Sequence, residues 1–340
     1  MKVRDLPTPA LVVDGAGLDR NLAAMAAALP GARCRPHVKA HKCTALALRQ
    51  RAAGHPGFTC ATPREVIGIA AAGLGDDLLL ANEVVDPDRL AALAAIDARV
   101  TVAVDSADTI SAAARAGIRE CLVDVNVGMP RCGCDPADAG RLAEQARTGG
   151  LEVRGVMGYE GHVVGVVDHD ERVRQTSVAM EKLALARDAV GGEVVSAGGT
   201  GTYAVNELAT EIQAGSYALM DTAYASERDL PFRPTLSIIA TVISVNAHDG
   251  FAVADCGLKA LGMDHGGPEV LGHTLWFCSD EHVTFSPDDG AALPTVGERV
   301  CVRPAHVDPT VAYHEVLHIA DRDGLDADVV ETWSVDLRGW

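Results

Sequence analysis

One lysine in this 340-residue chain stands where covalent chemistry could occur. The chain has five lysines against 24 arginines, and Lys39 closes a short predicted strand in the segment Arg35–Lys42. An amine can bond an aldehyde as a Schiff base, which a guanidinium cannot do. We therefore predict that Lys39 holds an aldehyde cofactor covalently; a solvated lysine is the alternative interpretation.

Two glycine-rich turns could bind a phosphate group. The segments SAGGTGTY at 196–203 and QAGSY at 213–217 each follow a predicted strand and offer backbone amides and hydroxyls, which suit an anion. The candidate phosphate ligands are Ser196, Gly199, Thr200, Gly201, Thr202, Gly215, Ser216 and Tyr217. Such turns are often merely tight turns, but combined with Lys39 they predict pyridoxal 5′-phosphate as the cofactor.

A histidine and a carboxylate two residues apart could bind a metal ion. His306 and Asp308 lie in the segment PAHVDPT, which we interpret as a strand. Residues i and i+2 of a strand share a face, so both side chains could bind one divalent ion. Taken alone, such a pair more often consists of polar surface residues that bind no metal.

The elements that must position these residues alternate regularly. Strands are predicted at 34–39, 57–62, 77–82, 100–105, 121–126, 151–159, 193–198 and 210–215, and amphipathic helices at 17–29, 63–73, 86–96, 135–149 and 170–191. Eight such units predict an α/β fold, a closed (β/α)8 TIM barrel. Active-site residues of such barrels lie at the carboxyl ends of the strands.

The pattern changes after residue 230. Alternating β-rich runs divided by Gly, Asp and Pro predict a second, mostly antiparallel β domain. We expect a barrel domain over 13–230 and a β domain over 231–340 that includes residues 1–12 and carries the metal pair.

Composition narrows the class of protein. The formal net charge of −18 disfavours nucleic acid and anionic membrane surfaces as partners. No segment approaches the ~18 consecutive apolar residues of a membrane span, and the N-terminus lacks a signal-peptide pattern. Nine cysteines, an odd number scattered through apolar segments, predict reduced thiols. We expect a cytoplasmic protein.

Ten segments together resemble one known family. They are RPHVKAHK at 35–42, CATPREV at 60–66, LLLANEVV at 78–85, VDVNVGMPRCG at 123–133, GVMGYEGH at 155–162, SAGGTGTY at 196–203, EIQAGSYALMD at 211–221, ADCGLKAL at 254–261, SDEH at 279–282 and RPAHVDPTV at 303–311. Their order and length make the chain similar to the fold-type III pyridoxal-phosphate enzymes, specifically the group of D-threonine aldolases and metal-dependent D-serine dehydratases, with an alanine racemase-like barrel.

The resemblance implies a role for several residues. Lys39 would bond the cofactor, and Arg131 would contact its phenolic oxygen. Tyr159 and His162 would lie near the cofactor ring and substrate. His306 and Asp308 would be the two residues that bind the metal ion. The resemblance also implies a homodimer.

It further implies a lyase that acts on D-β-hydroxy-α-amino acids. Asp308 offers a hard oxygen, which favours Mn²⁺ or Mg²⁺, with Zn²⁺ as the alternative, and favours retro-aldol cleavage to glycine and an aldehyde. Three alternatives remain: a D-serine or D-threo-3-hydroxyaspartate dehydratase forming a keto acid and ammonia, an amino acid racemase, and a non-enzymatic cofactor carrier. The sequence departs from relatives at Val283, after Glu281–His282, and its C-terminal tail has no assigned role.

Overall fold

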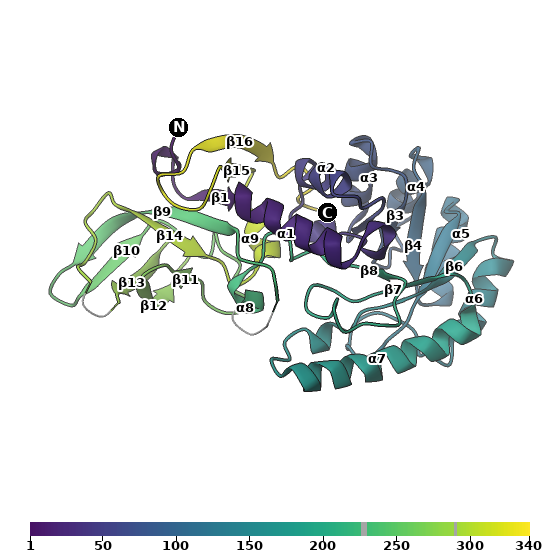
Figure 1. The fold of residues 1–340 in the computed structure, drawn as a ribbon. Coiled ribbons are helices and arrows are strands. Elements are labelled where there is room, and N and C mark those ends of the chain that lie inside the picture. Colours follow the sequence, from purple (N-terminus) through teal and green to yellow (C-terminus); the bar gives the residue numbers. More distant parts are fainter. Residues whose placement is uncertain (226–229, 289–290) are drawn as a thin grey trace. The chain divides into compact units, whose positions relative to one another are not determined.

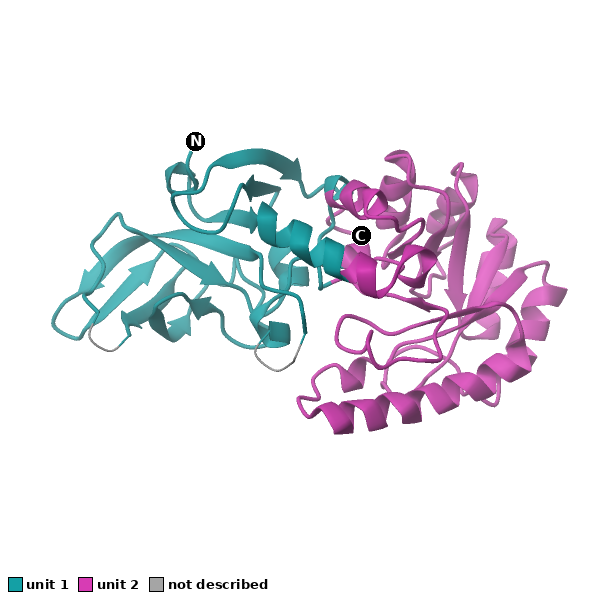
Figure 2. Cartoon of the chain, viewed as in Figure 1, with its two compact units in different colours: residues 1–24, 40–45, 216–336 teal, residues 25–39, 46–215, 337–340 magenta. Residues whose placement is uncertain are grey.

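The computed structural model describes residues 1–225, 230–288 and 291–340, which form two compact units (Figure 2). The barrel unit comprises Met25–Lys39, Leu46–Gly215 and Leu337–Trp340; the sheet unit comprises Met1–Ala24, Ala40–Ala45 and Ser216–Asp336. These units differ from the predicted division at residue 230. One reason lies within the sheet unit, where the Asn21 amide donates hydrogen bonds to the carbonyls of Ala218 and Arg233.

The barrel unit is built on parallel strands in sequence order (Figure 1). They are β2 (Phe58–Cys60), β3 (Leu78–Leu80), β4 (Val100–Val104), β5 (Glu120–Asp124), β6 (Glu152–Gly158), β7 (Val194–Ala197) and β8 (Glu211–Ile212). Residues 34–37 close the ring, because the Arg35 amide donates to the Ile212 carbonyl and the Thr59 amide to the Pro36 carbonyl, both at 2.9 Å. The predicted TIM-type barrel is confirmed.

Helices alternate with the strands, and five of them lie where the sequence predicts helices, while those at 44–52 and 107–116 were not predicted. They are α2 (Thr44–Ala52), α3 (Pro63–Ala71), α4 (Pro87–Ala95), α5 (Ala107–Ala116), α6 (Ala139–Thr148) and α7 (His169–Val190), while α1 (Gly15–Ala28) precedes the first strand. Thr62, Asp86, Ser106 and Asp168 each accept a hydrogen bond from an amide in the first turn of the helix that follows. These caps satisfy amides that have no partner inside the helix, so local sequence sets where each helix begins.

The sheet unit is mostly antiparallel, as predicted. It contains β1 (Ala10–Asp14), β9 (Leu236–Asn246), β10 (Phe251–Ala254), β11 (Glu269–Val270), β12 (His273–Cys278), β13 (Val283–Pro287), β14 (Arg299–Arg303), β15 (Val316–Ala320) and β16 (Val329–Ser334), with short helices α8 (Thr222–Ala225) and α9 (Val307–Tyr313). The N-terminal strand β1 lies between β9 and β15, antiparallel to the first and parallel to the second.

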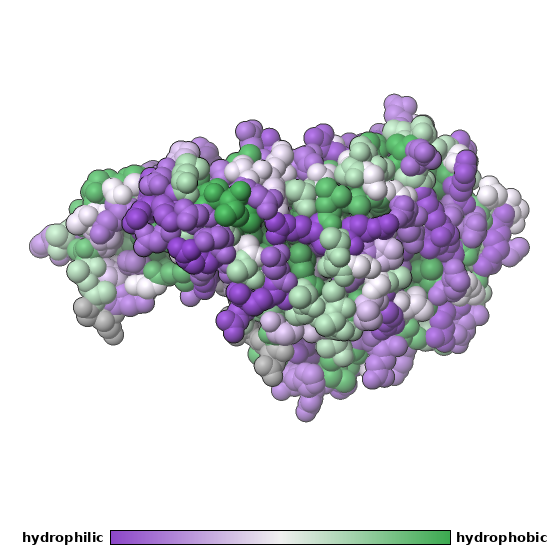
Figure 3. Space-filling model, turned by 45° about the horizontal axis from the view of Figure 1, so that its top comes forward, coloured by the Kyte–Doolittle hydropathy of each residue, from purple (hydrophilic) through white to green (hydrophobic). Residues whose placement is uncertain are grey.

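The described residues include no helix long and apolar enough to cross a membrane. On the face drawn in Figure 3, hydrophobic residues occur in small groups among hydrophilic ones. Scattered apolar side chains of this kind are ordinary on protein surfaces.

Candidate active site

Lys39 follows directly on the strand segment that closes the barrel. The last bridge of that segment pairs His37 with Thr59, and the chain then enters a short 3-10 turn at Val38–Ala40. The Lys39 amide donates to Nδ1 of His37 at 3.4 Å, and the lysine is half-buried. The turn therefore places Lys39 just beyond the carboxyl end of the first barrel strand.

Tyr159, just after β6, lies among the other residues predicted for the cofactor ring. The Arg131 guanidinium carbon is 5.4 Å from the centre of the Tyr159 ring. A Cβ built on Gly199 would lie 3.5 Å from the same ring. His162 packs against the backbone of Gly128, where a Cβ would approach its ring to 2.9 Å. The loops after β5, β6 and β7 thus bring Arg131, Tyr159 and Gly199 together, while His162 lies against Gly128 in the loop after β5.

Glu160 organises the predicted phosphate loop and was missed in the sequence. Its carboxylate is fully buried and accepts hydrogen bonds from the Gly198 amide (3.2 Å), the Thr202 hydroxyl (2.8 Å) and the Asn206 amide group (3.1 Å). The Thr202 hydroxyl also accepts from the Gly199 amide. The Thr202 side chain therefore fixes the conformation of the loop through hydrogen bonds to Gly199 and Glu160. In the sequence, the signal for Glu160 is an acid placed between Tyr159 and His162.

The remaining phosphate candidates divide between the units. Ser196 is buried at the end of β7, and its hydroxyl accepts a hydrogen bond from the Gln213 amide group at 2.9 Å. Thr200 and Gly201 are buried in the turn. Gly215 ends the barrel unit and Ser216 begins the sheet unit, where the fully buried Tyr217 ring packs against Phe232 with ring centres 5.6 Å apart. The Tyr217 ring is thus a core side chain.

A buried acid lies beside Arg131. Asp124 ends β5 and lines a small cavity with Arg131, Cys132 and Tyr159. Burial, followed by the neighbouring Glu83 carboxylate, raises the pKa of Asp124 well above its ordinary value, and Arg131 opposes the rise. A protonated carboxyl at this position can donate a hydrogen bond. Glu83 and Asp124 were not singled out in the sequence.

The predicted strand around His306 and Asp308 is wrong. His306 has extended backbone and directly precedes helix α9, whose first turn contains Asp308. Pro309 is tolerated there because the first amides of a helix have no intrahelical acceptor. The two side chains still approach one another, with Nε2 of His306 3.9 Å from Oδ1 of Asp308. Lys42 donates from Nζ to the Asp308 carbonyl at 2.7 Å.

Three further residues surround this pair within the sheet unit. Asp264 and His265 form with His306 a group whose ligand atoms lie within 4.8 Å of one another. Buried Asp221 accepts from the Val307 amide at 3.1 Å and so fixes the start of α9. Burial raises the pKa of Asp221 to about 6 against the backbone hydrogen bonds it accepts. In the sequence, the segment MDHGG at 263–267 was the available signal for Asp264 and His265.

These residues fit both groups that the sequence implies. Within the barrel unit, Lys39, Arg131 and the glycine-rich turn at 198–202 follow the carboxyl ends of three different strands, namely the segment 34–37, β5 and β7. Within the sheet unit, Nε2 of His306 lies 3.9 Å from Oδ1 of Asp308. Two metal–ligand bonds of about 2.1 Å can together span about 4.2 Å, so one ion can bond both atoms.

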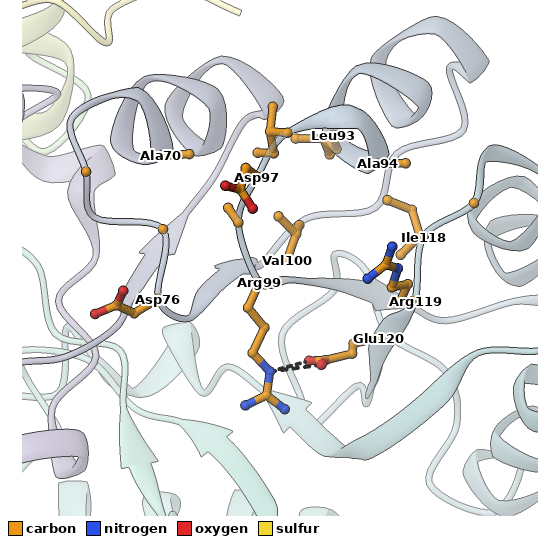
Figure 4. A pocket seen from close by; sticks show the side chains of 15 residues that line it. Ala70, Asp76, Leu93, Ala94, Asp97, Arg99, Val100, Ile118, Arg119 and Glu120 are labelled. Atoms are coloured by element: carbon orange, nitrogen blue, oxygen red, sulfur yellow. Dashed lines mark hydrogen bonds and ion pairs between the residues drawn. The ribbon is translucent and has the colours of Figure 1, made fainter.

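A separate cavity lies at the amino ends of β4 and β5 (Figure 4). It is lined by Asp76, Asp97 and Arg119, and an ion pair joins Arg99 to Glu120 at 2.8 Å. Amino ends of barrel strands commonly serve stability, and catalytic residues lie at the opposite ends. We assign no catalysis to this cavity.

Comparison with known proteins identifies the family. The model of the alanine racemase N-terminal domain matches residues 13–223, well over half of the chain. The chain belongs to this family. A second model, described as a putative serine dehydratase domain, matches residues 235–320. The alanine racemase-like barrel is therefore followed by a dehydratase-type domain that contains both His306 and Asp308.

Three relatives extend across nearly the whole chain. D-threonine aldolase from Arthrobacter sp. is 37% identical, covering 98% of this chain and 93% of the relative. The crystal structure of D-threonine aldolase from Filomicrobium marinum superposes with a TM-score of 0.92 at 36% identity, covering 98% and 96%. D-threo-3-hydroxyaspartate dehydratase from Delftia sp. HT23 is 29% identical over 98% of both chains. A variant of such a dehydratase is known in a metal-free form.

The family confirms the predicted class of enzyme. Its members related to this chain are aldolases and dehydratases, which are lyases, and the family supports pyridoxal phosphate as cofactor. The resemblance drawn from the ten sequence segments is confirmed.

Proposed function

We propose that this protein is a pyridoxal-phosphate- and metal-dependent lyase that cleaves D-β-hydroxy-α-amino acids to glycine and an aldehyde, as a D-threonine aldolase does. The observation that carries the proposal is the 3.9 Å approach of His306 to a carboxylate, Asp308, on a chain 37% identical to a D-threonine aldolase. A carboxylate oxygen suits Mn²⁺ or Mg²⁺ better than a thiolate would, and we propose Mn²⁺ or Mg²⁺ over Zn²⁺.

The chain's own residues divide the work. Lys39 would hold the cofactor through its amine. Arg131 lies beside the Tyr159 ring. Its positive charge would pair with the phenolate oxygen of the cofactor and orient the cofactor ring. Ser196, Gly199, Thr200, Gly201, Gly215, Ser216 and Tyr217 supply the turns proposed to bind the phosphate, chiefly through their backbone, and Thr202 holds its loop in shape through Glu160.

Bond cleavage requires removal of a proton from the substrate's β-hydroxyl. When bound, pyridoxal phosphate stabilises the negative charge that develops at the α-carbon, and the ion lowers the pKa of the hydroxyl. His306 and Asp308 would hold the ion. His162 is exposed in the turn that follows β6 and is the proposed proton acceptor or donor, because an imidazole nitrogen can accept or donate a proton. The electron pair of the Cα–Cβ bond stays with the glycine carbon, which is then reprotonated.

Three broader predictions accompany this activity. By resemblance, the enzyme is a homodimer. Its nine cysteines are free thiols, which fits the reducing cytoplasm. We also propose a division into a cofactor-binding barrel domain over 13–230 and a β domain over 231–340, joined by residues 1–12, that carries the metal site.

One assay tests the proposal. Cofactor-loaded protein is incubated with D-threonine, D-serine or D-threo-3-hydroxyaspartate, with and without a chelator. Glycine plus acetaldehyde from D-threonine, lost on chelation, supports the aldolase. A keto acid plus ammonia indicates the dehydratase instead, and racemisation that survives chelation refutes both. Borohydride reduction followed by peptide mapping should label Lys39, and Lys39→Ala should remove the label and the visible absorbance of the bound cofactor.

A further inference from the structure

We propose that Asp264 is the positioning residue of the metal site: it binds Nδ1 of His306 and thereby leaves Nε2 as the nitrogen that bonds the ion. This inference rests on the proposed metal pair of His306 and Asp308. The proposed function itself gives Asp264 no role.

The first argument is the geometry at Nδ1. Both carboxylate oxygens of Asp264 lie in the path of the Nδ1–H bond of His306, at 2.8 and 2.9 Å. An ion bonded to Nδ1 would have to occupy this same direction, so the carboxylate takes the place of an ion there. Asp308 lies near the other nitrogen, with Oδ1 3.9 Å from Nε2. The two ring nitrogens of His306 therefore have different neighbours: Nδ1 faces the hydrogen-bond acceptor Asp264, and Nε2 faces the second proposed ligand, Asp308.

The second argument is that the loop bearing Asp264 is tied to α9. An isolated antiparallel bridge pairs Gly262 with His306. The Gly262 amide donates to the Thr310 hydroxyl at 2.9 Å, and that hydroxyl donates to the His306 carbonyl at 2.7 Å. Asp264 is thus held two residues from a fixed point beside the imidazole, although its own side chain is 57% exposed.

Stacking restricts the remaining motion of the ring. The rings of His265 and His306 are parallel within 8°, with centres 3.8 Å apart. Stacking blocks one face of the His306 ring, and the Asp264 hydrogen bond fixes its rotation. A carboxylate on the far nitrogen of a metal-binding histidine selects the tautomer and increases the basicity of the ligating nitrogen, and losing it commonly lowers metal affinity 10- to 100-fold.

The test measures Mn²⁺ affinity directly. Mn²⁺ is titrated into chelator-treated, pyridoxal-phosphate-loaded protein, and free Mn²⁺ is read from its electron paramagnetic resonance signal. We expect Asp264→Asn to weaken binding about 10- to 100-fold. Asp249→Asn is the matched control, since Asp249 has the same 57% side-chain exposure in the same unit, and we expect a change below about twofold. Circular dichroism establishes that both variants are folded.

Two ligand variants separate this inference from the proposed function. If His306→Ala and Asp308→Ala bind Mn²⁺ as the parent does, the proposed metal pair is wrong. If these two lose binding while Asp264→Asn retains parental affinity, only the role of Asp264 is wrong. Water-proton relaxation of bound Mn²⁺ provides the last check: an additional water on the ion in Asp264→Asn would make Asp264 a direct ligand and overturn its role as a positioning residue.

Discussion

Glu160→Gln should loosen the predicted phosphate loop without disturbing the barrel. The substitution keeps the shape of the side chain but replaces one carboxylate oxygen with an NH2 group. The amide oxygen can still accept from Thr202 and Asn206, which lie on Oε1, and the NH2 then faces the Gly198 amide, which loses its acceptor. A buried donor left without an acceptor costs about 1–3 kcal/mol.

That cost should appear in two measurements. In urea unfolding of the cofactor-free protein, we expect the free energy of unfolding of Glu160→Gln to be about 1–3 kcal/mol lower than that of the parent. If the loss falls on the loop conformation that binds phosphate, pyridoxal-phosphate affinity drops about 5- to 150-fold, because 1.4 kcal/mol is tenfold. Glu160→Ala, which removes the acceptor of all three donors, should cost more in both assays.

Glu152→Gln serves as the matched control. Glu152 begins the same strand, β6, but is exposed, so we expect a change in the free energy of unfolding below about 0.5 kcal/mol and unchanged cofactor affinity. The reasoning is refuted if Glu160→Gln behaves like this control in both assays.

Two other predictions concern stability. Asp77 accepts from Arg154 at 2.8 Å and Arg35 at 2.6 Å; burial alone would raise its pKa, but these guanidinium groups outweigh burial and hold the pKa at about 2. The ionised Asp77 should therefore stabilise the fold by about 2 kcal/mol above pH 4, and this contribution should be lost as pH falls towards 2. Over that range, the urea midpoint of Asp77→Asn should fall less steeply with pH than that of the parent protein. Parallel curves for the two proteins would contradict this. Leu337, 2% exposed, packs closely on Gly68 of α3, and Leu337→Ala should lower stability by about 2–4 kcal/mol in thermal unfolding, whereas a tail without a structural role would leave it unchanged.

Much of the barrel follows from local sequence. Apolar runs of strand length and helical periods act within a few residues, so the barrel strands and five of its helices could be located without tertiary information, whereas α2 and α5 were not predicted. Lys39 was found because its amine follows directly on a strand, and barrel geometry places strand ends together. The glycine-rich turns followed from the same reasoning.

Contacts between distant segments were decided by the tertiary structure. His306 and Asp308 share a helix start instead of a strand face, because an extended residue followed by a first turn containing Pro309 is compatible with either local pattern. Glu160 and Asp264 show the same limit from the other side. Glu160 meets partners 38 to 46 residues away, and Asp264 meets His306 42 residues away. The residue types needed for chemistry are thus legible in the chain itself, whereas the hydrogen bonds that orient them arise only when folding brings remote segments into contact.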